Sequence, residues 1–204
     1  MAWYHLSQWL PCNFCKIFRA SQHGLCEKCW QQLPWDGELQ QRQDLQFRAS
    51  CFYQFPIDRV IHQFKDQAQM QHLALLQACL LQLPKPRVQA IVPMPLSTEK
   101  LIDRGFSQTY LLAQALSQQW QIPIWQPIAR HHRHSQRGLD RQQRLENLED
   151  IFYFHQNNNK IYRNVLMLDD VITTGMSLSL LKKQLISLGC QNVEAYCICN
   201  AILS

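Results

Sequence analysis

The sequence predicts an α/β fold, a parallel sheet flanked by helices, with a small N-terminal zinc module built on four cysteines. Strand-like and helix-like segments alternate from residue 85 onward, which is typical of a parallel sheet covered by helices. Two adjacent carboxylates end one strand-like run, and two Cys-x-x-Cys pairs lie near the N-terminus. A chain of 204 residues has room for one such domain and a small appendage.

Residues 1–40 are expected to form the zinc module. Cys12-x-x-Cys15 and Cys26-x-x-Cys29 are separated by ten residues, a spacing at which two short turns offer four thiolates to one Zn²⁺. A segment this short buries too little apolar surface to fold unaided, so a structural metal would supply the missing stability. Two disulfides or free buried thiols are the alternatives. The other five cysteines lie in apolar runs and are expected in the core.

Residues 41–84 are expected to connect the module to the main domain and to pack on its core. The run LQFRASCFYQF (45–55) favours a strand or a pair of strands. The apolar spacing of 60–83 is typical of an amphipathic helix. Pro-Lys-Pro at 84–86 then breaks the chain and indicates a domain boundary.

Residues 85–204 are expected to form the main domain. Strands are predicted over 88–92, 122–129, 151–154, 165–168 and 193–199, and helices over 101–120 and 177–189. Gly189 is well placed to end the last helix. In such sheets ligands bind beyond the carboxyl ends of the strands.

Asp169 and Asp170 mark the candidate binding site. Ionised carboxylates only accept hydrogen bonds, and two of them at a strand end suit the hydroxyl groups of a sugar. The turn that follows, Thr173-Thr174-Gly175-Met176-Ser177, leads into the helix at 177–189. Its backbone N–H groups and hydroxyls favour an anion such as phosphate. The pattern therefore predicts a ribose 5-phosphate site, with simple helix capping by Asp170 and Thr173 as the alternative.

The net charge of +5 is concentrated in one segment, which carries five arginines against a single aspartate, Asp140. Such a patch indicates an anionic partner, either the phosphates of a small ligand or a nucleic-acid backbone. A solvated loop is the alternative, and His131, His132 and His134 within the segment could also chelate a metal by chance. The five arginines are Arg130, Arg133, Arg137, Arg141 and Arg144.

Two resemblances extend these predictions. The segment VLMLDDVITTGMS (165–177) resembles the signature with which type I phosphoribosyltransferases bind phosphoribosyl pyrophosphate (PRPP). Together with VPMPLSTEKLIDRGFSQTYLLAQAL (92–116), CFYQFPIDRVIHQFKD (51–66) and the cysteine pairs, it resembles the ComF family, which is associated with competence and DNA uptake in bacteria. Gln136, the Arg144-x-x-Asn147 pair and Phe152 fit the same pattern.

The resemblance implies a type I phosphoribosyltransferase fold and assigns roles to residues. Asp169 and Asp170 would hold the ribose hydroxyls, residues 173–177 the 5′-phosphate, and Arg104 the pyrophosphate. The arginine-rich segment falls where these enzymes carry a loop that closes over PRPP, and Mg²⁺ would bridge pyrophosphate and ribose oxygens. Two departures bear on activity. Thr173 stands where some relatives carry a carboxylate general base, and Met176 stands where a small residue is commoner.

Two functions follow from these features. The first is a PRPP-binding, phosphoribosyltransferase-like protein acting in DNA uptake, with contact to single-stranded DNA through the basic segment and the zinc module. The second is an active phosphoribosyltransferase with a nucleobase or amine acceptor, and the retained PRPP site favours an enzyme. Competence helicase or recombination-mediator proteins are further candidate partners. No apolar run approaches the roughly 20 residues that span a bilayer, and the N-terminus lacks a signal-peptide pattern, so a cytoplasmic protein is expected.

Overall fold

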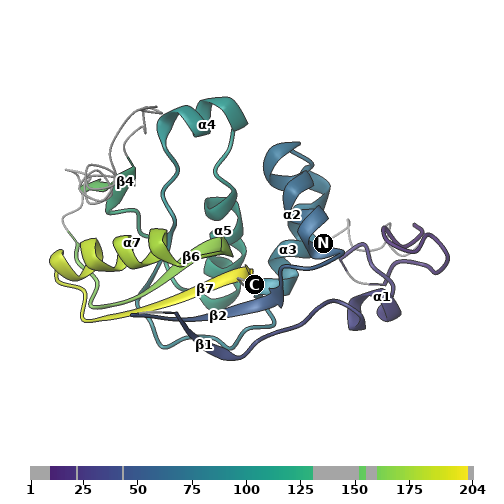
Figure 1. Cartoon of the computed structure of the whole chain (residues 1–204), viewed down its shortest axis with the longest axis horizontal. Coiled ribbons are helices and arrows are strands. Elements are labelled where there is room, and N and C mark those ends of the chain that lie inside the picture. Colours follow the sequence, from purple (N-terminus) through teal and green to yellow (C-terminus); the bar gives the residue numbers. More distant parts are fainter. Residues whose placement is uncertain (1–9, 22, 43, 131–151, 155–159, 202–204) are drawn as a thin grey trace.

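The computed structural model describes residues 10–21, 23–42, 44–130, 152–154 and 160–201 of the chain. Its centre is a five-stranded sheet in the order β1-β2-β7-β6-β3 (Figure 1). Neighbours among the last four strands pair in parallel, whereas β1 pairs antiparallel with β2 at one edge. The strands are β1 (Leu39–Arg42), β2 (Leu45–Phe52), β3 (Ala90–Pro93), β6 (Asn164–Ile172) and β7 (Asn192–Asn200). The predicted α/β fold with a parallel sheet is confirmed.

Helices cover both faces of the sheet because successive side chains of a strand point to opposite faces. In β6, Leu166 and Leu168 pack in one core cluster with residues of α2, α3 and α5. Val165 and Met167 pack in a second cluster with residues of α7. Burial on both faces explains why the strands read as continuous apolar runs rather than as alternating ones. The helices are α2 (Ile57–Asp66), α3 (Leu73–Leu80), α4 (Thr98–Arg104), α5 (Gln108–Trp120) and α7 (Met176–Ser187).

The predicted helix over 101–120 is wrong as a single helix. α4 ends at Arg104, because Gly105 adopts a left-handed conformation with φ of 75°, a region that favours glycine. Ser107 then caps α5, its hydroxyl accepting a hydrogen bond from the backbone N–H of Tyr110 at 3.4 Å. The resulting corner turns α4 away from α5, so that Arg104 faces α2 across a cleft.

The predicted helix over 60–83 is likewise divided. α2 ends at Asp66, Ala68 takes a positive φ of 52°, and a short 3₁₀ turn, η2 (Met70–His72), leads into α3. The side chain of His72 closes this corner, with Nε2 lying 2.8 Å from Oε1 of Gln63. The break leaves the C-terminal end of α2 beside the carboxyl end of β6.

The predicted strand over 122–129 is wrong in both extent and sheet. Only β4 (Ile128–Arg130) is a strand, and it pairs antiparallel with β5 (Phe152–Phe154) in a separate two-stranded sheet. Residues 123–125 pair with the main sheet only as a single bridge, between Ile124 and Ile91, among the described residues. Pro123 and Pro127 explain the difference, since proline has no backbone N–H to donate to a ladder.

The N-terminal module lies at one end of the molecule, with α1 (Glu27–Gln31) as its helix (Figure 1). Leu25 and Leu33 of this module pack into the same core cluster as α2 and α3. β2 belongs to the main sheet through its parallel pairing with β7. The division of the chain at residues 40 and 84 stays a proposal. Among the described residues, no helix combines the length and the apolar character needed to cross a membrane.

Candidate functional site

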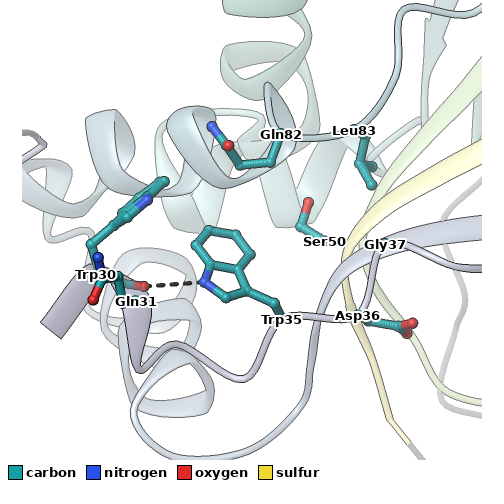
Figure 2. Close-up of a pocket in the computed structure, with 8 residues that line it drawn as sticks. All are labelled: Trp30, Gln31, Trp35, Asp36, Gly37, Ser50, Gln82 and Leu83. Atoms are coloured by element: carbon teal, nitrogen blue, oxygen red, sulfur yellow. Dashed lines mark hydrogen bonds between the residues drawn. The ribbon is translucent and has the colours of Figure 1, made fainter. Parts of the chain in front are cut away.

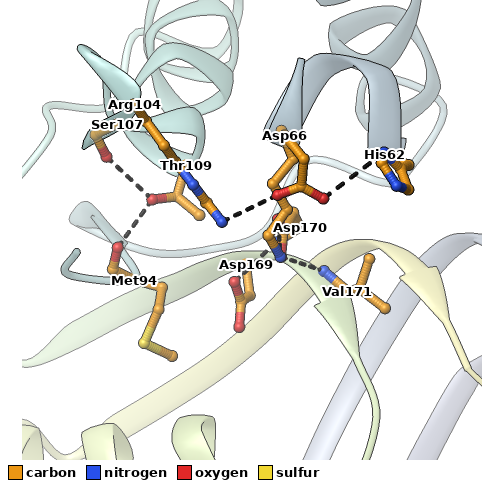
Figure 3. A network of polar contacts seen from close by, with 10 residues as sticks. His62, Asp66, Met94, Arg104, Ser107, Thr109, Asp169, Asp170 and Val171 are labelled. Carbon is orange, nitrogen blue, oxygen red and sulfur yellow. Dashed lines mark hydrogen bonds and ion pairs between the residues drawn. The ribbon is translucent and has the colours of Figure 1, made fainter. Parts of the chain in front are cut away.

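A cleft of about 450 Å³ opens at the carboxyl ends of β6 and β3. α2 and α4 form opposite walls, the loop after β3 contributes Met94, Pro95 and Leu96, and the turn after β6 closes one end. The location follows from the topology, because the strands of a parallel sheet deliver their following loops to one edge. Figure 3 shows the polar side chains that meet there.

Asp169 and Asp170 both line this cleft. Each carboxylate accepts a hydrogen bond from the next backbone N–H, at 2.9 Å from Asp170 N and 2.8 Å from Val171 N. Asp170 is buried and Asp169 half-buried. Burial and the adjacent Asp170 carboxylate raise the pKa of Asp169 well above its ordinary value. The chain thus holds two poorly solvated acceptors together, an arrangement that favours a hydroxyl-bearing or cationic ligand.

Lys65, at the end of α2, was missed by the sequence analysis as a site residue. Its ammonium nitrogen lies 3.0 Å from Oδ2 of Asp170, forming an ion pair that is largely shielded on the carboxylate side. The positive charge also opposes the rise in the pKa of Asp169. The only available signal was the FKD ending of the segment 51–66, which the resemblance included without assigning a role.

The turn after β6 forms a small pocket of about 50 Å³, lined by residues 171–178 together with Asp169. Thr173, Thr174 and Ser177 are exposed at this pocket, and Gly175 begins α7 with a φ of 79°. A left-handed residue at this position lets the chain turn sharply into the helix. Met176 also lines this pocket, and it is 38% exposed to solvent.

Arg104 reaches the cleft from α4. Its Nη2 lies 3.3 Å from Oδ1 of Asp66 on α2, and the imidazole of His62 lies 3.8 Å from the other oxygen of Asp66 (Figure 3). Nη1 of Arg104 is buried and has no hydrogen-bond partner among the described residues. A guanidinium with a free buried N–H is a strong donor to an anionic ligand.

Further cations gather at the same cleft. Lys100 of α4 and Arg130 of β4 line it together with Lys65 and Arg104. Partial burial and the charges of Arg130, Arg104 and Lys65 lower the pKa of Lys100. Like charges are unfavourable so close together unless an anion binds between them. Lys100 had no predicted role, although it lies inside the segment 92–116 on which the resemblance rests.

Of the five arginines of the basic segment (130–144), only Arg130 lies among the described residues. Arg130 lies in the cleft wall, with its guanidinium 5.8 Å from the ring centre of Phe152. Arg133, Arg137, Arg141 and Arg144 lie outside the described residues.

The four cysteines of the N-terminal module come together in one cluster. Their sulfur atoms all lie within 4.8 Å of one another, and Cys15 Sγ is 3.8 Å from Cys26 Sγ. Tetrahedral zinc with Zn–S bonds of about 2.3 Å places sulfurs about 3.8 Å apart. Burial alone would raise the pKa of Cys12, yet backbone N–H groups of Cys26, Cys15 and Phe14 lower it to about 6. None of the nine cysteines forms a disulfide. Cys12, Cys15, Cys26 and Cys29 therefore could hold one metal ion.

Comparison with known proteins assigns the family. Competence protein F of Haemophilus influenzae is 33% identical over 215 residues, covering 89% of this chain and 92% of that protein. The chain belongs to the ComF family. DNA utilization protein YhgH of Salmonella typhi is 28% identical over 97% of this chain and 93% of its own length. Competence protein ComFC of Bacillus subtilis is 32% identical over 48% of this chain and 39% of its own. No protein-family model matches the chain.

Among solved structures, an amidotransferase resembles part of this ComF-family chain. It is the glutamine PRPP amidotransferase from B. subtilis complexed with ADP and GMP, and the match covers 60% of this chain and 25% of that one. The sequence identity is 14% and the TM-score 0.42. A likeness this distant implies no shared function, and the fold of this chain is defined by its own strand order.

Proposed function

We propose that this ComF-family protein binds PRPP together with Mg²⁺ in the cleft at the end of β6, as part of a role in DNA uptake. The observation that carries the proposal is the gathering of carboxylates and cations in one cleft. Two carboxylates lie at the end of β6, and cations of α4 and β4 line the same cleft. Asp66 of α2, a third carboxylate, is already paired with Arg104. A sugar that carries phosphates matches both kinds of group, because its hydroxyls donate to carboxylates and its phosphates attract cations.

Each part of PRPP has a partner in this arrangement. The ribose hydroxyls would donate to Asp169 and Asp170, and the 5′-phosphate would enter the small pocket of residues 171–178, where helix α7 begins. The pyrophosphate would lie toward Arg104 and Lys100. Mg²⁺ prefers oxygen ligands and would join the pyrophosphate to the carboxylate side when bound. Calorimetric titration with PRPP and Mg²⁺ tests the proposal, and the absence of saturable binding would refute it.

Lys65 provides a pH-sensitive test. Replacing Lys65 with methionine removes the charge that opposes the high pKa of Asp169, so that pKa should rise further. A carboxylate with a raised pKa is protonated at higher pH, and a protonated carboxyl group is a weaker acceptor for ribose hydroxyls. We expect PRPP affinity to fall about tenfold at neutral pH, the effect of one charge-assisted contact, and to recover partly as pH increases.

The matched control for this prediction is Lys85→Met, because Lys85 is exposed and does not line the cleft. Its affinity for PRPP should equal that of the wild type at every pH. Equal affinity and equal pH dependence in the Lys65 variant would show that the ion pair with Asp170 has no part in binding.

The finer part of the DNA-uptake role, contact with single-stranded DNA, rests on the basic segment. Replacing Arg130, Arg133 and Arg137 with glutamine should weaken binding of a single strand. It should also reduce the slope of log affinity against log salt by about 0.7 for each lost phosphate contact. Arg163→Gln, an exposed arginine outside the segment, is the control. If the triple variant kept the salt slope of the wild type, single-stranded DNA would not contact this segment, and the transferase function would be favoured.

The second candidate function is transfer of phosphoribose to a nucleobase or an amine. The observation that favours it is the extension of the cleft beyond the aspartate pair to Tyr53 and His62, where an aromatic ring and an imidazole could meet an acceptor. Release of pyrophosphate from PRPP on addition of an acceptor tests this function. If PRPP binds and is never consumed with any acceptor of these classes, the protein is a PRPP-binding protein rather than a transferase.

We also propose that the ion of the cysteine cluster is zinc. Four thiolates in a tetrahedral arrangement are the commonest structural ligands of Zn²⁺, whereas Mg²⁺ and Ca²⁺ prefer oxygen. Elemental analysis of protein purified without added metal identifies the ion. A different metal at the same stoichiometry would contradict the assignment while leaving the site itself intact.

A further inference from the structure

A second cleft, of about 420 Å³, lies where the cysteine module meets the sheet and α3 (Figure 2). Trp30 and Trp35 form one wall, and Ser50 of β2, Gln82 and Leu83 contribute to the rest. It shares no lining residue with the cleft at the end of β6. Its volume is in the range of small-molecule sites. The proposed binding of PRPP makes no use of it.

The two indoles form a fixed aromatic wall. Their ring centres are 4.8 Å apart and the ring planes are inclined at 66°, an edge-on contact. Nε1 of Trp35 donates a hydrogen bond to the backbone carbonyl of Trp30 at 3.1 Å, which fixes one ring relative to the other. Both tryptophans remain half-buried although large aromatic side chains are favoured in the core. The cleft therefore leaves aromatic surface available to a ligand.

Ser50 gives this wall a polar counterpart. Its side chain is only 2% exposed, and its hydroxyl has no hydrogen-bond partner among the described residues. In Figure 2 the hydroxyl points from β2 toward the space beside Trp35 and Gln82. A buried hydroxyl without a partner is unfavourable, so a ligand that reaches it with a polar edge would remove this cost.

Three basic residues lie near the cleft, one in space and two in the chain. Arg48 donates a hydrogen bond to the carbonyl of Gly37, a residue of the cleft wall, at 2.9 Å. Lys85 and Arg87 are exposed and follow Leu83 closely in the chain. The carboxylate of Asp36, which also lines the cleft, already accepts hydrogen bonds from Gln40 and from the backbone of Glu38. The ligand is thus expected to be planar, polar at its edge and attached to an anion.

From these observations we infer that the Trp30–Trp35 cleft binds a planar heterocyclic base, carried either by a free nucleotide or by a nucleic-acid strand. The base stacks on an indole, as bases do on aromatic side chains. Its polar edge meets Ser50 and Gln82, and its phosphate lies toward the surrounding cations. A proline-rich peptide also docks on exposed tryptophans, but it has no use for a buried hydroxyl and gains nothing from the basic rim. This site is independent of the proposed PRPP site.

Titration followed by tryptophan fluorescence and by calorimetry tests the inference on the whole chain loaded with its metal. The probes are a short oligothymidylate, thymidine 5′-monophosphate and a proline-rich peptide. The variants are Trp30→Leu and Ser50→Ala, and Phe18→Leu is the matched control. Phe18 is an aromatic residue of the same module, 52% exposed, that does not line the cleft.

We expect wild-type protein to bind oligothymidylate with quenching of fluorescence, and Trp30→Leu to weaken binding about tenfold or more, the effect of losing one stacked base. Ser50→Ala should weaken it severalfold, whereas Phe18→Leu should not change it. Equal affinity for the mononucleotide would identify a free nucleotide as the source of the base. Much tighter binding of the oligomer that Trp30→Leu weakens would identify a strand, because contacts made by the basic segment alone would not depend on Trp30.

Three results would overturn the inference. The first is that both cleft variants bind the oligothymidylate with wild-type affinity. The second is that the wild type binds neither thymidine probe, and the third is that it binds the proline-rich peptide and neither thymidine probe. Metal content serves as the fold check for Trp30→Leu, and if that variant loses its metal, Ser50→Ala decides alone. Asp169→Asn with Asp170→Asn should leave binding of the oligothymidylate unchanged, so failure of the PRPP proposal would be seen separately.

Discussion

Replacing both Asp169 and Asp170 with asparagine should weaken the binding of PRPP about a hundredfold and leave the fold intact. Each substitution removes one charge-assisted hydrogen bond to a ribose hydroxyl, and two such bonds are worth about 3 kcal/mol together. The fold should survive because, among the described residues, both side chains bond only to adjacent backbone groups and, for Asp170, to Lys65. The loss of the ion pair should be small in cost, since the side chain of Lys65 is 31% exposed and water can solvate its charge.

The measurement is calorimetry with PRPP and Mg²⁺, with thermal unfolding as the check on the fold. Asp103→Asn is the control, because Asp103 is an exposed carboxylate on α4 that does not line the cleft. If the double variant bound PRPP with wild-type affinity, the ribose would not bind at this end of β6. The affinity of unmodified protein should also fall as pH is lowered through the raised pKa of Asp169, since protonation removes the ionised acceptor.

The parts of the site that the sequence predicts are those contributed by one continuous segment. The aspartate pair, the turn and the start of α7 follow one another in the chain, so their order alone indicates a strand, a ligand-binding turn and a helix. Burial of β6 on both faces made its strand easy to predict, because Val165 to Leu168 are all fully buried. The glycine at position 175 was also predictable from the local chain, because the residue before the helix has a positive φ, which favours glycine.

The missed parts depend on segments that meet only after folding. Lys65 reaches Asp170 at the end of α2, and Lys100 lines the cleft because the chain turns at Gly105 between α4 and α5. Both breaks interrupt patterns that read as continuous helices, since glycine and alanine at these positions do not by themselves end an amphipathic repeat. Ser50 and Trp35 were unpredictable for the same reason, because their cleft forms between the module, β2 and the end of α3.

Removing the metal from the cysteine cluster should cost the N-terminal module its structure. Metal binding supplies about 10 to 16 kcal/mol to the folding of comparable zinc peptides, and the module has few other sources of stability. Its own helix, α1, is five residues long and contains no buried residue. Leu25 and Leu33 anchor the module to the core, and Trp30 and Trp35 pack against the same cluster while only half-buried. Each buried leucine supplies about 1.5 to 3 kcal/mol, whereas ordering the backbone costs about 1 to 2 kcal/mol for every residue of 10–35, so this packing alone does not order the segment.

Chelation or the double variant Cys26→Ser with Cys29→Ser should therefore expose residues 10–35 to rapid proteolysis and lower the melting temperature of the whole chain. The melting temperature should fall because Leu25 and Leu33 leave a core cluster shared with α2 and α3. Cys190→Ala is the control, as Cys190 is buried between α7 and β7, outside the cluster. Limited proteolysis with and without added Zn²⁺ measures the effect. A module that resists protease equally well after the metal is removed would mean that its packing against the core, rather than the four thiolates, holds it in place.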